Sequence, residues 1–221
     1  MPVLFSRLRL FISKFKIKVY ILKTLALTGG PGCGKSTASA YFQSRGWHII
    51  DADQVCHDIY AAPDPGLKQK LTAHWGEDVI APDGSVNRPA LAKAVFSCNA
   101  SRNGVAELNA IVHPVLHQEI RARLNALPPD SIAVLDAALL YETGWDSLAT
   151  DGVIAIWTDR AQQEQRLRER GWDDQQIAGR IAAQISADEK LARAKYGLIN
   201  NSTVEDLYRQ CALLSETIET N

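Results

Sequence analysis

One stretch near the start of the chain constrains the fold more than any other feature. Residues 27–37 read L-T-G-G-P-G-C-G-K-S-T, and residues 29–36 match G-x-x-x-x-G-K-[ST], the phosphate-binding P-loop. An apolar run, residues 21–27, comes just before the motif, and a stretch with helical character, residues 36–44, follows it. This order predicts a strand, a glycine-rich loop and a helix, which is the context the motif needs to bind a nucleoside triphosphate.

The chemistry of the motif supports a phosphate site over a bare turn. Glycines let the backbone approach a polyphosphate and aim N–H groups at its oxygens, and the following helix adds the partial positive charge of its N-terminus. Lys35 is placed to reach the β- and γ-phosphates, and Ser36 to put its hydroxyl on Mg²⁺. A turn without a ligand would need neither four glycines nor the Lys-Ser pair.

Composition is that of an ordinary globular enzyme. The chain of 221 residues is 46% hydrophobic and 22% charged, and no apolar run is long enough to span a bilayer. Its four cysteines are far apart and contain no C-x-x-C pair, which favours reduced cytosolic thiols over a zinc site or a disulfide framework. We therefore expect a cytoplasmic protein without stable membrane insertion.

Charge is distributed unevenly between the start of the chain and the rest. The first 23 residues carry six basic and no acidic residues, which leaves 18 basic against 25 acidic residues elsewhere. An acidic body argues against nucleic-acid binding. The basic extension, residues 1–20, has apolar residues at helical spacing, as in a membrane-surface helix or a targeting peptide. A dispensable or mis-assigned leader is the alternative that we favour.

Strands alternate with helices along the chain, which predicts an α/β fold with a mainly parallel sheet. Expected strands are residues 21–28, 47–50, 132–135, 152–157 and 197–199. Residues 61–129 lack clear strands and show helical patterns at 66–75, 89–96, 104–112 and 114–127, so we expect a helical insertion that forms a substrate subdomain. Ser202-x-x-Glu205 predicts the start of the last helix at Ser202.

Two acidic positions follow expected strands, on the edge where the P-loop should also lie. Asp53 is the candidate base for a hydroxyl acceptor, and Asp51 the candidate support for the loop or for a magnesium-bound water. An Asp pair that merely caps the next helix is the structural alternative. Asp136 follows the buried run 132–135, where an acid serves the metal, orients substrate or is structural.

A pair of arginines completes the candidate chemistry. Arg166 and Arg170 are four residues apart in the expected helix 160–170 and so share one face. Arginines on a mobile lid, residues 160–187, would clamp the transferring phosphoryl group.

An ordered series of motifs resembles the dephospho-coenzyme A kinase family over residues 25–214. The motifs are L-T-G-G-x-G-x-G-K-S-T at 27–37, D-A-D-x-x-x-H at 51–57, P-G at 65–66, D-G-x-x-x-R at 83–88, L-N-x-I-x-H-P at 108–114, L-D-x-x-L-L-x-E at 135–142, Q-R-L-x-x-R at 165–170 and R-I-x-x-Q at 180–184. Other small-molecule kinases share the P-loop, but the later motifs, above all L-N-x-I-x-H-P, distinguish this family.

The resemblance implies a three-layer P-loop NTPase fold and transfer of the ATP γ-phosphate to the ribose 3′-hydroxyl of dephospho-CoA, the last step of coenzyme A synthesis. It implies a core of residues 21–60 and 130–221 that includes the lid, and a CoA-binding subdomain at 61–129. The implied ATP-binding residues are Gly32, Cys33, Gly34, Lys35, Ser36 and Thr37. The implied catalytic residues are Asp53, Lys35, Arg166 and Arg170, and the implied substrate residues are His57, Arg88, His113 and Asp136.

Mg²⁺ is the implied cofactor, on Ser36 with Asp51 or Asp136, directly or through water. A helix-entry residue before proline is the alternative role for His113. We expect a monomer or weak homo-oligomer. Ala137-Ala138 stands where the family commonly has Val-Pro, which would loosen the loop after Asp136. The rival predictions are another small-metabolite kinase and an ATP-binding module without catalysis.

Overall fold

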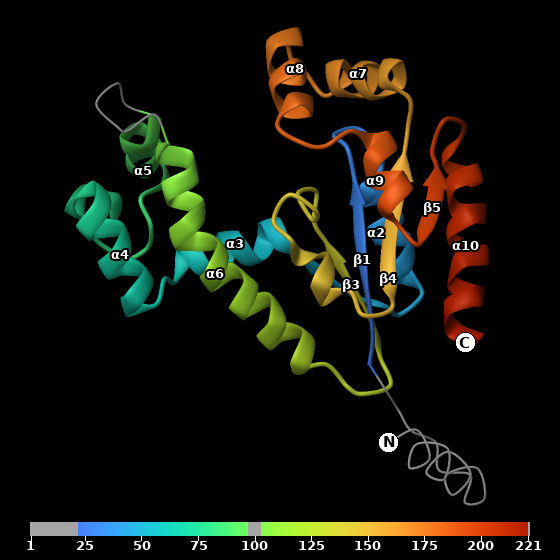
Figure 1. Cartoon of the computed structure of the whole chain (residues 1–221), viewed down its shortest axis with the longest axis horizontal. Helices are drawn as coiled ribbons and strands as arrows, with labels where there is room; N and C mark the ends of the chain where they lie inside the picture. Colours follow the sequence, from blue (N-terminus) through green and yellow to red (C-terminus); the bar gives the residue numbers. More distant parts are fainter. Residues whose placement is uncertain (1–21, 97–102, 221) are drawn as a thin grey trace, which may run out of the picture.

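The structure, a computed structural model, describes residues 22–96 and 103–220. Five parallel strands form one sheet in the order β2-β3-β1-β4-β5 (Figure 1). The strands are β1 (Lys23–Gly29), β2 (His48–Asp51), β3 (Ile132–Asp136), β4 (Gly152–Trp157) and β5 (Tyr196–Ile199). The predicted parallel α/β sheet is therefore confirmed, and each strand boundary lies within two residues of its expected position.

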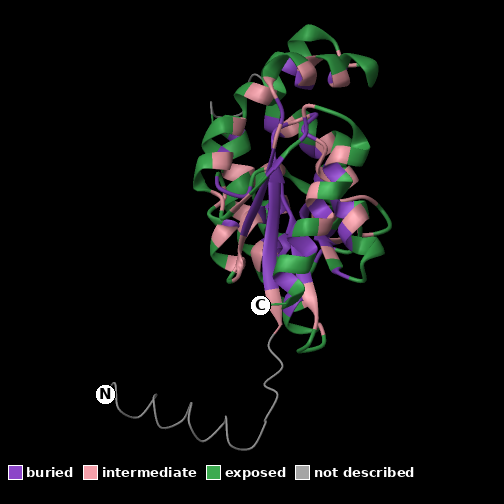
Figure 2. Cartoon of the chain, turned by 90° about the vertical axis from the view of Figure 1, so that its right-hand side faces the viewer, coloured by how far each residue is buried: buried purple, intermediate pink, exposed green. Residues whose placement is uncertain are grey.

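Helices cover both faces of the sheet, and the strands are buried between them (Figure 2). On one face, α2 (Lys35–Ser44) packs against α10 (Val204–Thr220), and the rings of Phe42 and Trp47 stack with centroids 4.7 Å apart. On the other face lie α3 (Ala52–Ala61) and α6 (Gly104–Asn125). A three-layer arrangement follows, because parallel strands bury both of their faces.

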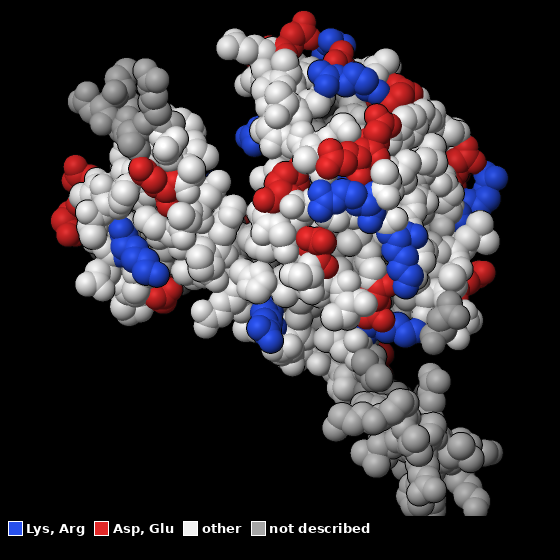
Figure 3. All heavy atoms as spheres, in the orientation of Figure 1, with Lys and Arg blue, Asp and Glu red and all other residues white. Residues whose placement is uncertain are grey.

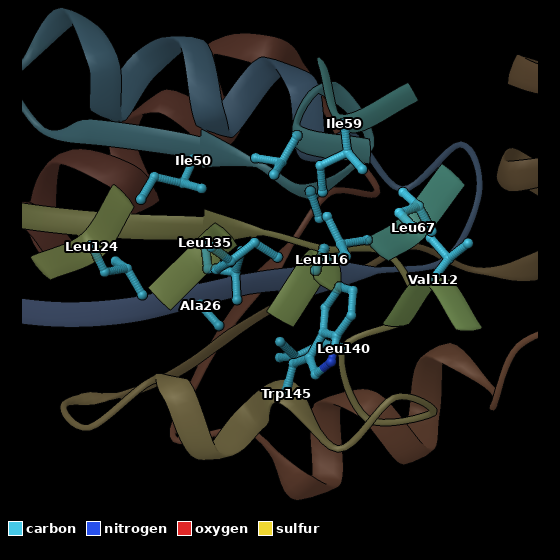
Figure 4. Packing of buried hydrophobic residues seen from close by; sticks show 14 of the residues in the cluster. Ala26, Ile50, Ile59, Leu67, Val112, Leu116, Leu124, Leu135, Leu140 and Trp145 are labelled. Atoms are coloured by element: carbon cyan, nitrogen blue, oxygen red, sulfur yellow. The ribbon is translucent and has the colours of Figure 1, made fainter. Parts of the chain in front are cut away.

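The helical insertion comes between β2 and β3 in the chain. Besides α3 and α6 it contains α4 (Pro65–Trp75), a short 3₁₀ turn η1 (Glu77–Val79) and α5 (Arg88–Phe96). Apolar side chains of α3, α4 and α6 join those of β1, β2 and β3 in one continuous core (Figure 4). The insertion is thus packed onto the sheet through its first and last helices.

The two helices expected at 104–112 and 114–127 are one helix, α6, with Pro114 inside it. Proline in a helix interior costs roughly 3 kcal/mol, because it removes a hydrogen bond and crowds the preceding turn. The buried residues Val112, Leu116, Ile120 and Leu124 recur every four positions, and their burial offsets that cost. The prediction of two separate helices, which was based on helix propensity, was therefore wrong.

A second group of helices follows β4. These are α7 (Arg160–Glu169), α8 (Asp174–Ala182) and α9 (Ala187–Arg193), and a 3₁₀ turn η2 (Trp145–Leu148) precedes β4. The space-filling view shows a hollow between the α4–α6 lobe and the α7–α8 lobe (Figure 3). The last helix begins at Val204, and Thr203 Oγ1 accepts from the N–H of Asp206, so the predicted start at Ser202 was wrong.

The basic extension predicted for residues 1–20 lies outside the described residues. Within the described ranges, every helix is too short or too polar to cross a bilayer.

Candidate functional site

The P-loop joins β1 to α2 and bends sharply to do so. Gly32 and Gly34 have φ values of 76° and 98°, a left-handed conformation that costs other residues about 1–2 kcal/mol. A Cβ on Gly32 would lie 2.9 Å from the carbonyl oxygen of Gln163, so the loop also needs glycine for space. The Cys33 carbonyl accepts hydrogen bonds from Asn200 Nδ2 (2.9 Å) and Thr158 Oγ1 (3.3 Å). The loop is therefore held in shape from β4 and β5.

Parallel strands bring the predicted acids to the P-loop edge. Asp136, at the end of β3, pairs in register with Leu27 of β1 and with Asp51 of β2. Since the carboxyl ends of parallel strands lie on the same edge of a sheet, the loop and both acids lie on one edge.

Lys35 and Asp136 form an ion pair at the centre of this edge. Lys35 Nζ lies 2.8 Å from Asp136 Oδ1, and Ser39 Oγ donates to Asp136 Oδ2 at 2.6 Å. The side chains are 19% and 10% exposed, so water screens the pair only weakly. The P-loop ammonium is thus oriented by a carboxylate that comes from a different strand.

The two acids of the D-A-D motif have separate places in the structure. Asp51 caps α3, because its Oδ1 accepts from the N–H groups of Asp53 (2.8 Å) and Gln54 (3.2 Å). The alternative of a helix cap is therefore borne out for Asp51. Asp53 lies in the first turn of α3 with an exposed side chain that faces a cavity. Asp53 remains available to an acceptor.

That cavity, of about 250 Å³, lies between the insertion, the loop after β3 and the end of α8. We call it the acceptor pocket. It is lined by Ala52, Asp53, Cys56, Tyr60, Asn109, Val112, His113, Leu116, Ala137, Ala138, Leu139, Thr143, Trp145, Arg180 and Gln184. Burial raises the pKa of Tyr60 to about 12 and lowers the pKa of His113, so both side chains are neutral near pH 7. A wall of mixed apolar and polar side chains suits an organic acceptor that carries polar groups.

The predicted substrate residues fall in different places. His113 lines the acceptor pocket and meets the ring of Trp145 edge-to-face at 5.6 Å. Arg88, at the start of α5, is near enough to Cys56 to influence its thiol electrostatically. His57 is exposed and is not part of the pocket wall. Asp136 is bound to Lys35 instead of facing the pocket.

Of the two lid arginines, the structure brings only Arg166 to the P-loop. Its guanidinium donates to the carbonyl of Gly32 at 3.3 Å and to that of Asn200 at 2.9 Å. Arg170 ends α7 and is exposed. The two side chains do not form a common clamp in this conformation.

Two residues of the predicted lid that were not chosen as site residues from the sequence lie in the pocket wall. Arg180 and Gln184 lie one turn apart on α8 and just beyond it, and both face the acceptor pocket. Arg180 also lies over the ring of Trp172, at 6.0 Å from its centroid. The R-I-x-x-Q motif contained the signal, since residues four apart on a helix share a face.

Comparison with known proteins assigns the family. The dephospho-CoA kinase family model matches residues 23–206. A dephospho-CoA kinase of Corynebacterium glutamicum is 37% identical over 193 residues, which cover 86% of this chain and 94% of that protein. One from Acinetobacter baylyi is 35% identical over 192 residues, covering 87% and 96%.

Solved structures share the fold of this chain. A Thermus thermophilus protein superposes with a TM-score of 0.73 at 27% identity, covering 91% of this chain and 99% of that one. The dephospho-CoA kinase of Campylobacter jejuni, at 21% identity and a TM-score of 0.68, covers 89% and 97% and supports the fold. The P-loop, the acidic edge and the sequence matches lead to one conclusion: the chain belongs to the dephospho-CoA kinase family.

Proposed function

We propose that this chain transfers the γ-phosphoryl group of ATP to the ribose 3′-hydroxyl of dephospho-CoA, with Asp53 as the base. Membership of the dephospho-CoA kinase family supports the assignment of the reaction. The placement of Asp53 carries the assignment of the base, because its exposed carboxylate lines the acceptor pocket at the same sheet edge as the P-loop. A carboxylate there orients the hydroxyl and takes its proton as the O–P bond forms.

The remaining roles follow from position. Gly32–Thr37 hold the ATP phosphates with backbone N–H groups, and Lys35 neutralises charge on the transferring group. Lys35 would then exchange its Asp136 contact, at 2.8 Å, for phosphate oxygens. Arg166 already lies against the loop, and closure of the lid would bring Arg170 to the transferring group. His113, with Arg180 and Gln184, positions the acceptor.

Mg²⁺ fits the oxygen donors of this edge. Ser36 at the start of α2 and the Asp136 carboxylate, with Asp51 through water, are the hard ligands that Mg²⁺ prefers. Among the described residues, no three acidic, histidine or cysteine side chains lie together as a ready-made metal cluster. The ion would offset phosphate charge during transfer.

The cytoplasm is the proposed location. Cys33, Cys56 and Cys211 are free thiols, the state that a reducing compartment maintains.

The test measures ADP release from Mg-ATP with dephospho-CoA, AMP, CMP or no acceptor. The Asp53→Asn variant should lose about 10²–10⁴-fold in turnover with dephospho-CoA, the usual contribution of a general base. Asp58→Asn is the matched control, because Asp58 lies on α3 but contacts Arg123 outside the acceptor pocket. Equal turnover of Asp53→Asn and wild type would reject Asp53 as the base, and turnover of another acceptor alone would reject the substrate.

A further inference from the structure

A fully buried lysine joins the two walls of the acceptor pocket. Lys190, on α9, has no exposed surface, and its ammonium has three oxygen partners. It donates to the Ala138 carbonyl at 2.5 Å and to Gln184 Oε1 at 2.7 Å, and it lies 3.3 Å from Glu142 Oε1. An ammonium has three protons to donate, so these three oxygens satisfy it completely.

The partners of Lys190 come from two segments, the loop after β3 and the turn after α8. Ala138 lies in the pocket wall after β3, and its carbonyl also accepts from Thr28 Oγ1 of β1 at 3.3 Å. Gln184 lines the pocket from the base of the lid. Glu142 Oε1 accepts from the N–H of Ile185 at 2.9 Å, which ties the same two segments a second time. The ammonium is the common point of these contacts.

The loop after Asp136 is attached to the rest of the protein by side chains from other elements. Ala137-Ala138 was expected to loosen the loop after Asp136, yet the Ala138 carbonyl accepts from two side chains. The attachment comes from β1 and α9 instead of from the loop's own residues.

We propose that Lys190 is a positioning residue for phosphoryl transfer. It fixes Gln184, at the base of the predicted lid, to the pocket wall, so that the acceptor hydroxyl is held at the correct distance from the P-loop. Burying an ammonium is costly unless it is fully paired, and mere attachment of α9 would not require one. Arg193, one turn further on α9, attaches to the same loop by lying over the Tyr141 ring at 4.1 Å, and it does so at the surface. The distinctive contact of Lys190 is Gln184, at the base of the lid.

The inference rests on the proposed reaction, and its test uses variants that separate positioning from stability. Lys190→Met leaves the Glu142 carboxylate without its cation, so it will lower stability as well as turnover. The double variant K190M/E142Q removes that uncompensated charge. Arg193→Ala is the matched control, because it weakens the attachment of α9 to the loop without touching Gln184.

We expect K190M/E142Q to melt close to wild type and to bind ATP within threefold of wild type. Its kcat/KM for dephospho-CoA should be at least about tenfold lower, since a misplacement of about 1 Å suffices for losses of that size. More ATP should also be hydrolysed per CoA formed, a readout that simple destabilisation would not change.

Full turnover in the double variant, a double variant that fails to fold, or an equal loss of turnover in Arg193→Ala would each overturn the proposal. Wild-type protein that does not phosphorylate dephospho-CoA would overturn the proposed reaction instead.

Discussion

Substitution of Gly34 tests whether the P-loop depends on its contact with β5. Gly34 has φ 98°. A Cβ there would lie closer to Asn200 Nδ2 than 3.0 Å, a separation below which Cβ contacts essentially never occur in proteins. Gly46 provides a matched control, because it has φ 85° and a Cβ there would meet nothing within 4 Å. Both substitutions to alanine impose the left-handed conformation, but only Gly34→Ala displaces Asn200.

The expected magnitudes follow from these contacts. An alanine in the left-handed conformation destabilises the folded state by about 1–2 kcal/mol. Alanine also lowers the conformational entropy of the unfolded chain, which offsets about 0.4–1 kcal/mol of that loss, so Gly46→Ala should lower the free energy of unfolding by about 1 kcal/mol. Gly34→Ala also disturbs two hydrogen bonds of Asn200, both 2.9 Å long. In one, Asn200 Nδ2 donates to the Cys33 carbonyl, and in the other the Arg166 guanidinium donates to the Asn200 carbonyl. These add about 2–3 kcal/mol at typical hydrogen-bond values. Gly34→Ala should therefore cost about 3–4 kcal/mol in total.

Urea unfolding measures the stability of both variants, and titration calorimetry measures ATP affinity. We expect Gly34→Ala to weaken ATP binding at least about tenfold, because the backbone N–H groups of the shifted loop no longer point at the same phosphate. Gly46→Ala should bind ATP with the wild-type affinity. The reasoning would be refuted if the two variants unfolded with free energies within about 0.5 kcal/mol of each other or bound ATP equally well.

Two further predictions concern the core and the pocket. Phe42→Ala should lower the free energy of unfolding by about 3–5 kcal/mol in urea titrations, because Phe42 is fully buried and stacked on Trp47; a loss below about 1 kcal/mol would contradict this packing. Burial lowers the pKa of His113 below its ordinary 6.5, so the unfolded chain binds the extra proton and stability should rise with pH through the range just below 6.5. His113→Gln should flatten that rise in unfolding experiments from pH 5 to 7, and an unchanged slope would contradict the assignment.

Local features of the site were predictable from sequence. The P-loop was found because its glycines, Lys35 and Ser36 are adjacent in the chain, and their chemistry depends on a strand and a helix directly beside them. Asp53 and Asp136 could be placed because each lies at or just after the end of a strand, and a parallel sheet gathers such positions at one edge. The alternation of strands and helices gave the sheet for the same local reason.

Features that depend on tertiary packing could not be predicted from the sequence. Continuous α6 contradicted the helix break expected at Pro114, because burial of one face outweighed local propensity. The substrate role of His57 was predicted from its place in a motif and stays a prediction; its side chain is exposed and is not part of the pocket wall. A motif records which residues recur together, and only the packing of α3 decides which of its faces meets the pocket.

The sequence by itself determined a P-loop, a parallel sheet and the acidic edge beside them, because each is encoded within a few neighbouring residues. Tertiary structure alone decided the pairing of Lys35 with Asp136, 101 residues apart, and the meeting of Lys190 with Ala138 and Gln184. No local pattern marks Lys190 for burial, since a lysine in a short helix ordinarily faces water. Its charge is stable inside the protein only because the loop after β3 and the turn after α8 place three oxygens around it.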